Sequence, residues 1–306
     1  MIYLDNNATT PLDPAVAAEI SLELEKQHAN AGSQHQAGRM ARRTLESARE
    51  TIAKQLGLNC SDIHADHIVF TSGATEANNL ALRGLLAEKV GTNARVVISS
   101  QEHPSIDQCA AFLAANGHPV VRVNSLASGI IDLDHLESVV DGDTAAVSII
   151  HANNETGVIQ PLAQISDICN VVGVPLHTDA VQAVGKMQWD FQAIPVTSAT
   201  VSAHKLHGPV GVGALLVRHG TQLYPQITGG FQQEGFRAGT ECVFLAAALA
   251  KTLELCCGEG AAGYRLALGS LRDRFESQIT SNVPDVQVLG SGVSRVPHTS
   301  CISFQG

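Results

Sequence analysis

The sequence contains no run of about 18 apolar residues free of charge, so it predicts no membrane-spanning helix. Its 19 lysine and arginine residues are outnumbered by 29 aspartate and glutamate residues, which gives a formal net charge of −10. This acidic balance argues against direct nucleic-acid binding and against docking on an anionic membrane. Residues 1–5 (MIYLD) lack the basic and apolar regions of a signal peptide, and we therefore expect a cytoplasmic protein.

The seven cysteines form no CxxC pair, and the 13 histidines form neither an HxxxH nor an HExxH pattern. These patterns place metal ligands at a useful spacing, and since the sequence has none of them, we expect no metal site. The adjacent pair Cys256 and Cys257 is a poor disulfide or zinc framework, and we expect reduced thiols. Cys242 begins an apolar segment, which predicts packing in the core.

Short apolar runs alternate with longer segments of helical spacing. Strands are predicted at 67–71, 95–99, 119–123, 145–151, 174–178, 199–203 and 213–217. Helices are predicted at 36–56, 75–88, 105–116, 133–140, 162–172, 240–255 and 264–279. In 36–56 the apolar positions Met40, Leu45, Ala48, Ile52 and Leu56 share one face. The repeated strand-then-helix order predicts an α/β fold with a mostly parallel sheet between helices.

Polar residues cluster where the predicted strands end, at 72–75, 102–103, 153–155, 179 and 202–205. In α/β sheets, ligands bind beyond the carboxyl ends of the strands. Convergence from five separate segments is stronger evidence than any single motif. The sequence therefore predicts one ligand site at this edge of the sheet.

Lys205 is the most informative of these residues. It follows the apolar, β-branched run 198–201 and precedes a Gly-Pro turn, so its amine is expected at the mouth of a buried strand. Burial lowers the pKa of an amine and makes it a nucleophile near neutral pH. The alternative is a surface lysine in the Gly-Pro loop.

Asp179 ends the apolar run 174–179. A carboxylate there could face a pyridine nitrogen, and the alternative is a plain helix cap. A Schiff-base lysine and an aspartate for the pyridinium are the groups that pyridoxal 5′-phosphate chemistry needs most. Gln182, three residues further on, would reach the same ring.

Four more segments fit such a cofactor. The turn at 72–75 carries Gly73 and begins a helix, which favours a phosphate, although a simple N-cap by Ser72 or Thr75 explains it equally. A flat His103 imidazole could stack on the ring, or it could be structural. Asn154 could donate to a phenolate oxygen, or it could belong to an Asn-rich turn. The glycine-rich loop 229–240, with one arginine, suits an anion, often that of a partner subunit.

Taken together, these segments resemble the cysteine desulfurases, pyridoxal-phosphate enzymes of fold type I in the class V aminotransferase group. The resemblance covers nearly the whole chain, at residues 4–11, 30–38, 70–79, 102–103, 151–157, 177–182, 202–213 and 229–240. It implies a large cofactor-binding domain over 15–247. It also implies a smaller α+β domain, formed by 1–14 and 248–306 and incomplete at its C-terminus.

The resemblance also implies roles for the residues. Lys205 would form the Schiff base, Asp179 would pair with the pyridine nitrogen, and His103 would stack on the ring and relay protons. Asn154 and Gln182 would contact the ring oxygen. The phosphate would be held by Ala74, Thr75, Ser202 and His204. Thr240 would reach the phosphate in the neighbouring subunit, which implies a homodimer.

In this family, L-cysteine is converted to L-alanine and its sulfur passes to an enzyme cysteine as a persulfide. An acceptor protein then takes the sulfur for iron–sulfur clusters or for tRNA thiolation. The family's nucleophilic cysteine and its substrate-carboxylate arginine lie beyond the strand at 301–304, so we expect this chain to be truncated before both. Two alternatives remain: a related lyase or aminotransferase-like enzyme without a cysteine nucleophile, and a catalytically silent cofactor-binding scaffold.

Overall fold

The computed structural model describes residues 2–26, 29–60, 62–86 and 94–304. The α-helices are α1 (Pro14–Glu25), α2 (Gln36–Leu56), α3 (Ala74–Leu86), α4 (Pro104–Ala115), α5 (Leu133–Val139), α6 (Leu162–Val171), α7 (Val243–Cys257) and α8 (Ala261–Asn282). The strands are β1 (His67–Thr71), β2 (Arg95–Ser99), β3 (Val120–Val123), β4 (Thr144–Ser148), β5 (Leu176–Asp179), β6 (Ser198–Ser202), β7 (Gly213–Val217), β8 (Val286–Val288) and β9 (Ile302–Phe304). Part of the helix predicted at 75–88 lies outside the described residues.

A seven-stranded sheet forms the centre of the molecule, in the order β1-β7-β6-β5-β4-β2-β3. β7 runs antiparallel to both β1 and β6, and the remaining neighbours are parallel. The connection from β6 to β7 spans only 203–212, which is too short for the crossover that a parallel pair requires. The predicted α/β fold with a mostly parallel sheet is confirmed, and each predicted strand is present in it.

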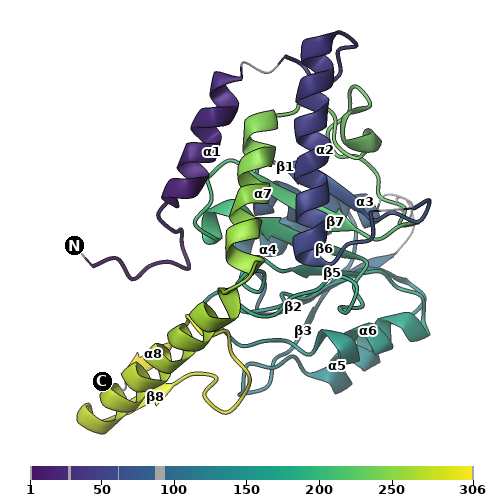
Figure 1. The fold of residues 1–306 in the computed structure, drawn as a ribbon. Helices are drawn as coiled ribbons and strands as arrows, with labels where there is room; N and C mark the ends of the chain where they lie inside the picture. Colours follow the sequence, from purple (N-terminus) through teal and green to yellow (C-terminus); the bar gives the residue numbers. More distant parts are fainter. Residues whose placement is uncertain (1, 27–28, 61, 87–93, 305–306) are drawn as a thin grey trace.

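Helices cover both faces of this sheet (Figure 1). The side chains of β7 pack alternately into the cores on the two faces of the sheet. Ala214 and Leu216 pack into the core beneath α2 and α7, whereas Leu215 and Val217 pack against α3 on the opposite face. Because alternate residues of a strand point to opposite faces, burial of both faces produces the continuous apolar run seen in the sequence.

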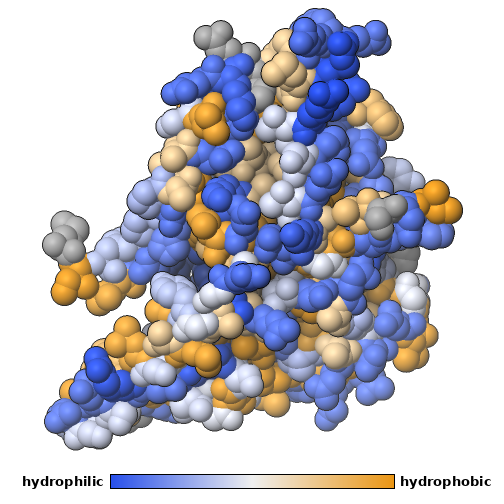
Figure 2. All heavy atoms as spheres, viewed as in Figure 1, coloured by the Kyte–Doolittle hydropathy of each residue, from blue (hydrophilic) through white to orange (hydrophobic). Residues whose placement is uncertain are grey.

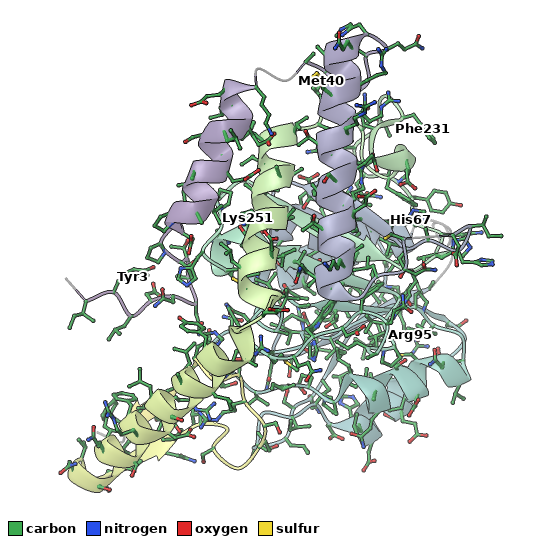
Figure 3. All side chains as sticks on the ribbon, viewed as in Figure 1. Tyr3, Met40, His67, Arg95, Phe231 and Lys251 are labelled. Carbon is green, nitrogen blue, oxygen red and sulfur yellow. The ribbon has the colours of Figure 1, made fainter. Side chains whose placement is uncertain are left out.

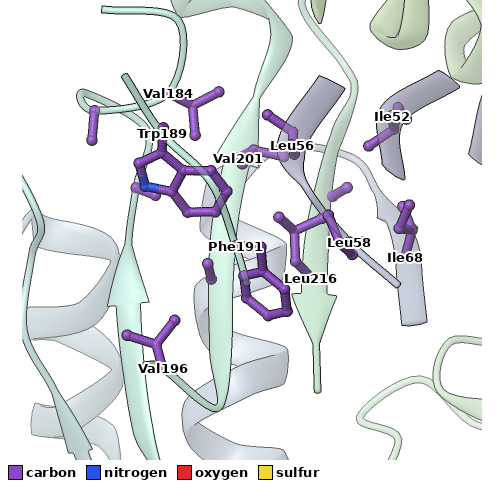
Figure 4. Packing of buried hydrophobic residues seen from close by; sticks show 14 of the residues in the cluster. Ile52, Leu56, Leu58, Ile68, Val184, Trp189, Phe191, Val196, Val201 and Leu216 are labelled. Atoms are coloured by element: carbon purple, nitrogen blue, oxygen red, sulfur yellow. The ribbon is translucent and has the colours of Figure 1, made fainter. Parts of the chain in front are cut away.

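The larger core lies between the sheet and α2. Helix α2 buries Leu45, Ile52 and Leu56 and ends at Gly57, whose φ of 69° suits a residue without a side chain. The backbone nitrogen of Phe191 donates to the Leu56 carbonyl oxygen at 2.7 Å, and Figure 4 shows the fully buried Phe191 ring in this core. Met40, expected on the same face, is instead 51% exposed.

Two elements were not predicted from the sequence. Helix α1 begins at Pro14, and the Asp13 carboxylate accepts a hydrogen bond of 2.7 Å from the Ala15 backbone nitrogen. The short strand β8 pairs with β9 in a two-stranded antiparallel sheet beside α8. This part extends to the lower left in Figure 1, and Figure 2 shows apolar residues interleaved with polar ones along it. The predicted boundary at 247–248 falls within α7, and the division into two domains stays a prediction.

Within the described ranges, no helix combines the length and the apolar character that crossing a membrane requires. All seven cysteines are free thiols. The expectation of core packing was wrong for Cys242, which is exposed because it is the N-cap residue of α7 and precedes the buried face of that helix.

A candidate cofactor site at the strand ends

A cavity of about 690 Å³ opens at the carboxyl ends of β1, β4, β5 and β6. Every residue predicted for the site lines this cavity except Thr240: Ala74, Thr75, His103, Asn154, Asp179, Gln182, Ser202, His204 and Lys205. Thr240 is exposed on the loop before α7. The residues arrive from separate elements because the strands converge at this edge of the sheet.

Lys205 ends the 3₁₀ turn that directly follows β6. Its Nζ donates hydrogen bonds of 2.6 Å to the carbonyl oxygens of both Asn7 and Ala8. Burial lowers the pKa of Lys205, and the nearby carboxylates of Asp179 and Asp5 partly offset that effect. The N-terminal segment therefore holds this amine against the cavity wall, in place of the exposed position that a loop lysine would have.

Asp179 is the last residue of β5 and is only 3% exposed. Its Oδ1 accepts from the Val181 backbone nitrogen at 3.0 Å, and its Oδ2 accepts from Asn78 Nδ2 at 2.7 Å. Burial raises the pKa of this carboxyl group, while the two hydrogen bonds oppose the rise. A cation placed against the carboxylate would favour its charged form. Asp179 thus caps a turn and also lines the cavity, so a capping role and a role in binding the cofactor are compatible.

A further group of lining residues suits a phosphate. Gly73 has a φ of 150°, and open space surrounds the position where a side chain would begin. Next to it, the N-terminus of α3 presents backbone N–H groups, which attract anions. The Ser202 hydroxyl is buried and finds no hydrogen-bond partner among the described residues. A phosphate group would supply that missing partner, so these residues fit a phosphorylated cofactor.

Glu76 ties this turn to the glycine-rich loop. Its Oε2 accepts from the Ser72 backbone nitrogen at 2.7 Å, and its Oε1 accepts from Arg237 Nε at 2.7 Å. The pKa of Glu76 is lowered: burial opposes this, but hydrogen bonds from Arg237 and Ser72 prevail. The arginine noted in the sequence therefore holds a carboxylate of its own chain.

Gln182 lies between two lysines. Its Nε2 donates to the Asn7 carbonyl oxygen at 3.1 Å, the same oxygen that Lys205 contacts, and its Oε1 accepts from Lys186 Nζ. Burial lowers the pKa of Lys186 to about 7, and the charge on Lys205 contributes to the decrease. The Asn154 carbonyl oxygen accepts from Asn7 Nδ2 at 3.0 Å. Sequence reasoning did not single out Asn7 or Lys186.

His103 is the N-cap residue of α4 and also lines the cavity. Its Nδ1 accepts from the Ser105 backbone nitrogen at 3.1 Å, and the Ser105 hydroxyl oxygen lies 2.8 Å away. The structural interpretation of this histidine and the functional one are therefore both compatible with its position.

None of the seven cysteines, all of which lie within the described residues, lines the cavity. Cys256 donates to the Leu206 carbonyl oxygen at 3.1 Å, and burial raises its pKa to about 12. Burial also raises the pKa of Cys301, which precedes β9. Neither thiol has the lowered pKa that a reactive thiolate needs.

The sheet order, the cavity and the lysine–aspartate pair are those of a pyridoxal-phosphate protein of fold type I. The chain matches the aminotransferase class-V family over residues 2–306. It is 39% identical over 308 residues to a cysteine desulfurase of Trichormus azollae, covering 100% of this chain and 74% of the relative. It is 40% identical to a cysteine desulfurase of Bradyrhizobium diazoefficiens over 303 residues, covering 99% and 75%.

Solved structures agree. A NifS-like protein from Rickettsia africae superposes with a TM-score of 0.90 at 32% identity, over 100% of this chain and 82% of that one. The structure of SspA in complex with cysteine superposes with a TM-score of 0.87 at 30% identity, over 100% and 84%. The chain belongs to the class V aminotransferase family, among the cysteine desulfurases. It is an enzyme that depends on pyridoxal phosphate.

Proposed function

We propose that the chain converts L-cysteine to L-alanine and passes the sulfur, as a cysteine persulfide, to an acceptor protein for iron–sulfur clusters or tRNA thiolation. The names of the curated relatives and the cysteine complex of SspA support this substrate. One observation carries the proposal: the Lys205 amine and the Asp179 carboxylate line the same cavity as the Ser202 hydroxyl, which has no partner among the described residues.

Each residue of the site has a proposed role in the reaction. Pyridoxal phosphate supplies an electron sink for a carbanion at the substrate Cα. Lys205 would hold the cofactor covalently, and its lowered pKa suits an amine that accepts the Cα proton at Nζ. Asp179 would pair with the ring nitrogen, and His103 would stack on the ring and relay protons. Asn154 and Gln182 would contact the ring oxygen. Ala74, Thr75, Ser202 and His204 would hold the phosphate.

The sulfur nucleophile needs a separate source. Sulfur transfer forms an S–S bond to an enzyme thiolate and breaks the substrate Cβ–S bond, and Cβ takes up a proton, so no outside oxidant is required. None of the seven cysteines lines the cavity, and no arginine in the described part of the chain lines it either. We infer that a thiol other than these seven takes the sulfur, and that none of the seven is the nucleophile.

We also propose a homodimer in the cytoplasm. Thr240 is exposed and does not line its own cavity, as expected if it contacts the phosphate bound by a second copy. The same loop presents Phe231, which is 84% exposed and labelled in Figure 3. A large exposed apolar side chain in the loop that carries Thr240 suits an interface core more than contact with water.

Exchange of the substrate Cα proton tests the proposal without requiring the sulfur nucleophile. Residues 1–306, loaded with pyridoxal phosphate, are incubated with L-cysteine in D₂O. We expect deuterium at Cα, no persulfide on any of the seven cysteines, and loss of exchange in Lys205→Ala. Formation of pyruvate and ammonia would favour a lyase, and absence of exchange would favour a silent scaffold. A persulfide on one of the seven cysteines would contradict the inferred external nucleophile.

A further inference from the structure

Asn78 lies in α3, behind the cavity wall, and has no exposed surface. Its Nδ2 donates to Asp179 Oδ2 at 2.7 Å and to the Ser105 hydroxyl oxygen at 2.8 Å. Its Oδ1 lies 3.2 Å from His177 Nε2. All the hydrogen-bonding directions of this amide except one lone pair are therefore filled by buried polar groups.

The neighbours of the amide fix its orientation. An ionised carboxylate only accepts hydrogen bonds, so the amide NH₂ must face Asp179. Burial lowers the pKa of His177 to about 3, and this imidazole is therefore neutral. Its Nδ1 lies 2.9 Å from the Ser198 hydroxyl, which can donate to it, and its Nε2 then carries the proton and donates to Asn78. Turning the amide over would disrupt each of these bonds.

The same amide also reaches His103. Because the Ser105 hydroxyl oxygen accepts from Asn78, its own hydrogen can point to His103 Nδ1, 2.8 Å away. The Ser105 backbone N–H donates to the same nitrogen. With Nδ1 accepting both bonds, the neutral imidazole of His103 carries its proton on Nε2.

We infer that Asn78 is a positioning residue for the cofactor reaction. Its hydrogen bond to Asp179 Oδ2 favours the charged carboxylate, the form that would pair with the ring nitrogen, and it sets the tautomer of His103 through Ser105. This inference rests on the roles proposed above for Asp179 and His103. A polar helix residue otherwise explained as core packing thus acts on the cofactor through two of its neighbours.

A cofactor analogue separates positioning from simple structural support. Pyridoxal phosphate and its 1-deaza analogue, in which carbon replaces the ring nitrogen, are titrated into the apoprotein and followed by absorbance. In Asn78→Leu, Asp179 loses its donor, and we expect pyridoxal phosphate to bind about 10- to 100-fold more weakly. Binding of the deaza analogue should not change, because it presents no ring nitrogen to the carboxylate.

Asn79→Leu is the matched control, since the neighbouring amide donates only to the Thr75 carbonyl oxygen at 2.9 Å. It should leave the affinities for both cofactors unchanged. Asn78→Ala is the second variant, in case leucine prevents folding, and circular dichroism checks that each variant is folded. Equal weakening of both cofactors by Asn78→Leu and Asn78→Ala would overturn the inference, because loss of structural support affects the two cofactors alike.

The state of His103 gives an independent readout. In protein with ¹⁵N-labelled histidine, the signals of His103 are assigned by their loss in His103→Gln. We expect an unprotonated Nδ1 and a protonated Nε2, and the opposite tautomer would overturn the inference. Failure of the wild-type protein to bind pyridoxal phosphate covalently would instead overturn the proposed function, so the two failures are distinguishable.

Discussion

Replacement of Glu102 by glutamine should stabilise the protein, and the gain should increase as the pH rises from 5 to 8. Glu102 precedes His103, and its Oε1 accepts from the Ser99 hydroxyl at 2.7 Å and from the Ile150 backbone nitrogen at 2.7 Å. Its Oε2 is buried with no partner in the described part of the chain. Burial raises the pKa of Glu102 from 4.5 to about 8, and the charge of Asp179 adds to the rise.

The direction of the change in stability with pH follows from proton binding. Between pH 4.5 and about 8 the folded protein retains a proton that the unfolded chain releases, so the free energy of unfolding decreases as the pH rises. Each pH unit in this window costs about 1.4 kcal/mol, which gives about 3 kcal/mol at pH 7. Glutamine keeps the accepting oxygen and never ionises, so the variant avoids this cost.

Urea unfolding of the apoprotein, measured from pH 5 to pH 8, tests this reasoning. The stability difference between Glu102→Gln and the wild type should be small at pH 5 and reach about 3 kcal/mol at pH 7. Glu50→Gln, on the exposed side of α2, is the control and should show no such trend. A difference that does not vary with pH would refute the assignment of a buried, protonated Glu102.

Three further predictions follow from the structure. Ser202→Ala should weaken binding of pyridoxal phosphate about 10-fold and leave apoprotein stability unchanged in urea, because the hydroxyl has no hydrogen-bond partner among the described residues. Phe191→Ala should cost about 3–5 kcal/mol in urea unfolding, whereas Phe231→Ala should change stability by less than about 0.5 kcal/mol, since the first ring is buried and the second exposed. Glu76→Gln should speed tryptic cleavage after Arg237 about fivefold, by removing an ion pair worth about 1 kcal/mol.

The apolar runs predicted the strands because both faces of the sheet are buried, and turn residues delimit each run. The ends of the strands were predicted less accurately. The run 145–151 exceeds β4, which ends at Ser148, because the chain stays buried and extended after it. The direction of β7 depends on loop length, which strand patterns do not express. Helix α1 was missed although Asp13 and Pro14 are common start signals.

The sequence predicted the site residues that act through their side chains at strand ends. It did not predict those that act through a backbone carbonyl or through a tertiary contact. Asp179 ends an apolar strand and Lys205 follows one, and a charged residue at such a position is a recognisable sign of a ligand site in the sequence. Asn7 contributes a carbonyl oxygen to Lys205 and Gln182, and any residue type could provide that group. Asn78 lies in a helix, and only tertiary packing brings it to Asp179.

Reduction with borohydride followed by peptide mapping tests the central claim most directly. The site contains two partly buried lysines, Lys205 and Lys186, and burial lowers the pKa of each. Only Lys205 lines the cavity. The account predicts that the reduced pyridoxyl group is found on Lys205 and that Lys205→Ala loses the visible absorbance of the bound cofactor. A pyridoxyl group on Lys186, or on any other lysine of the wild-type protein, would contradict it.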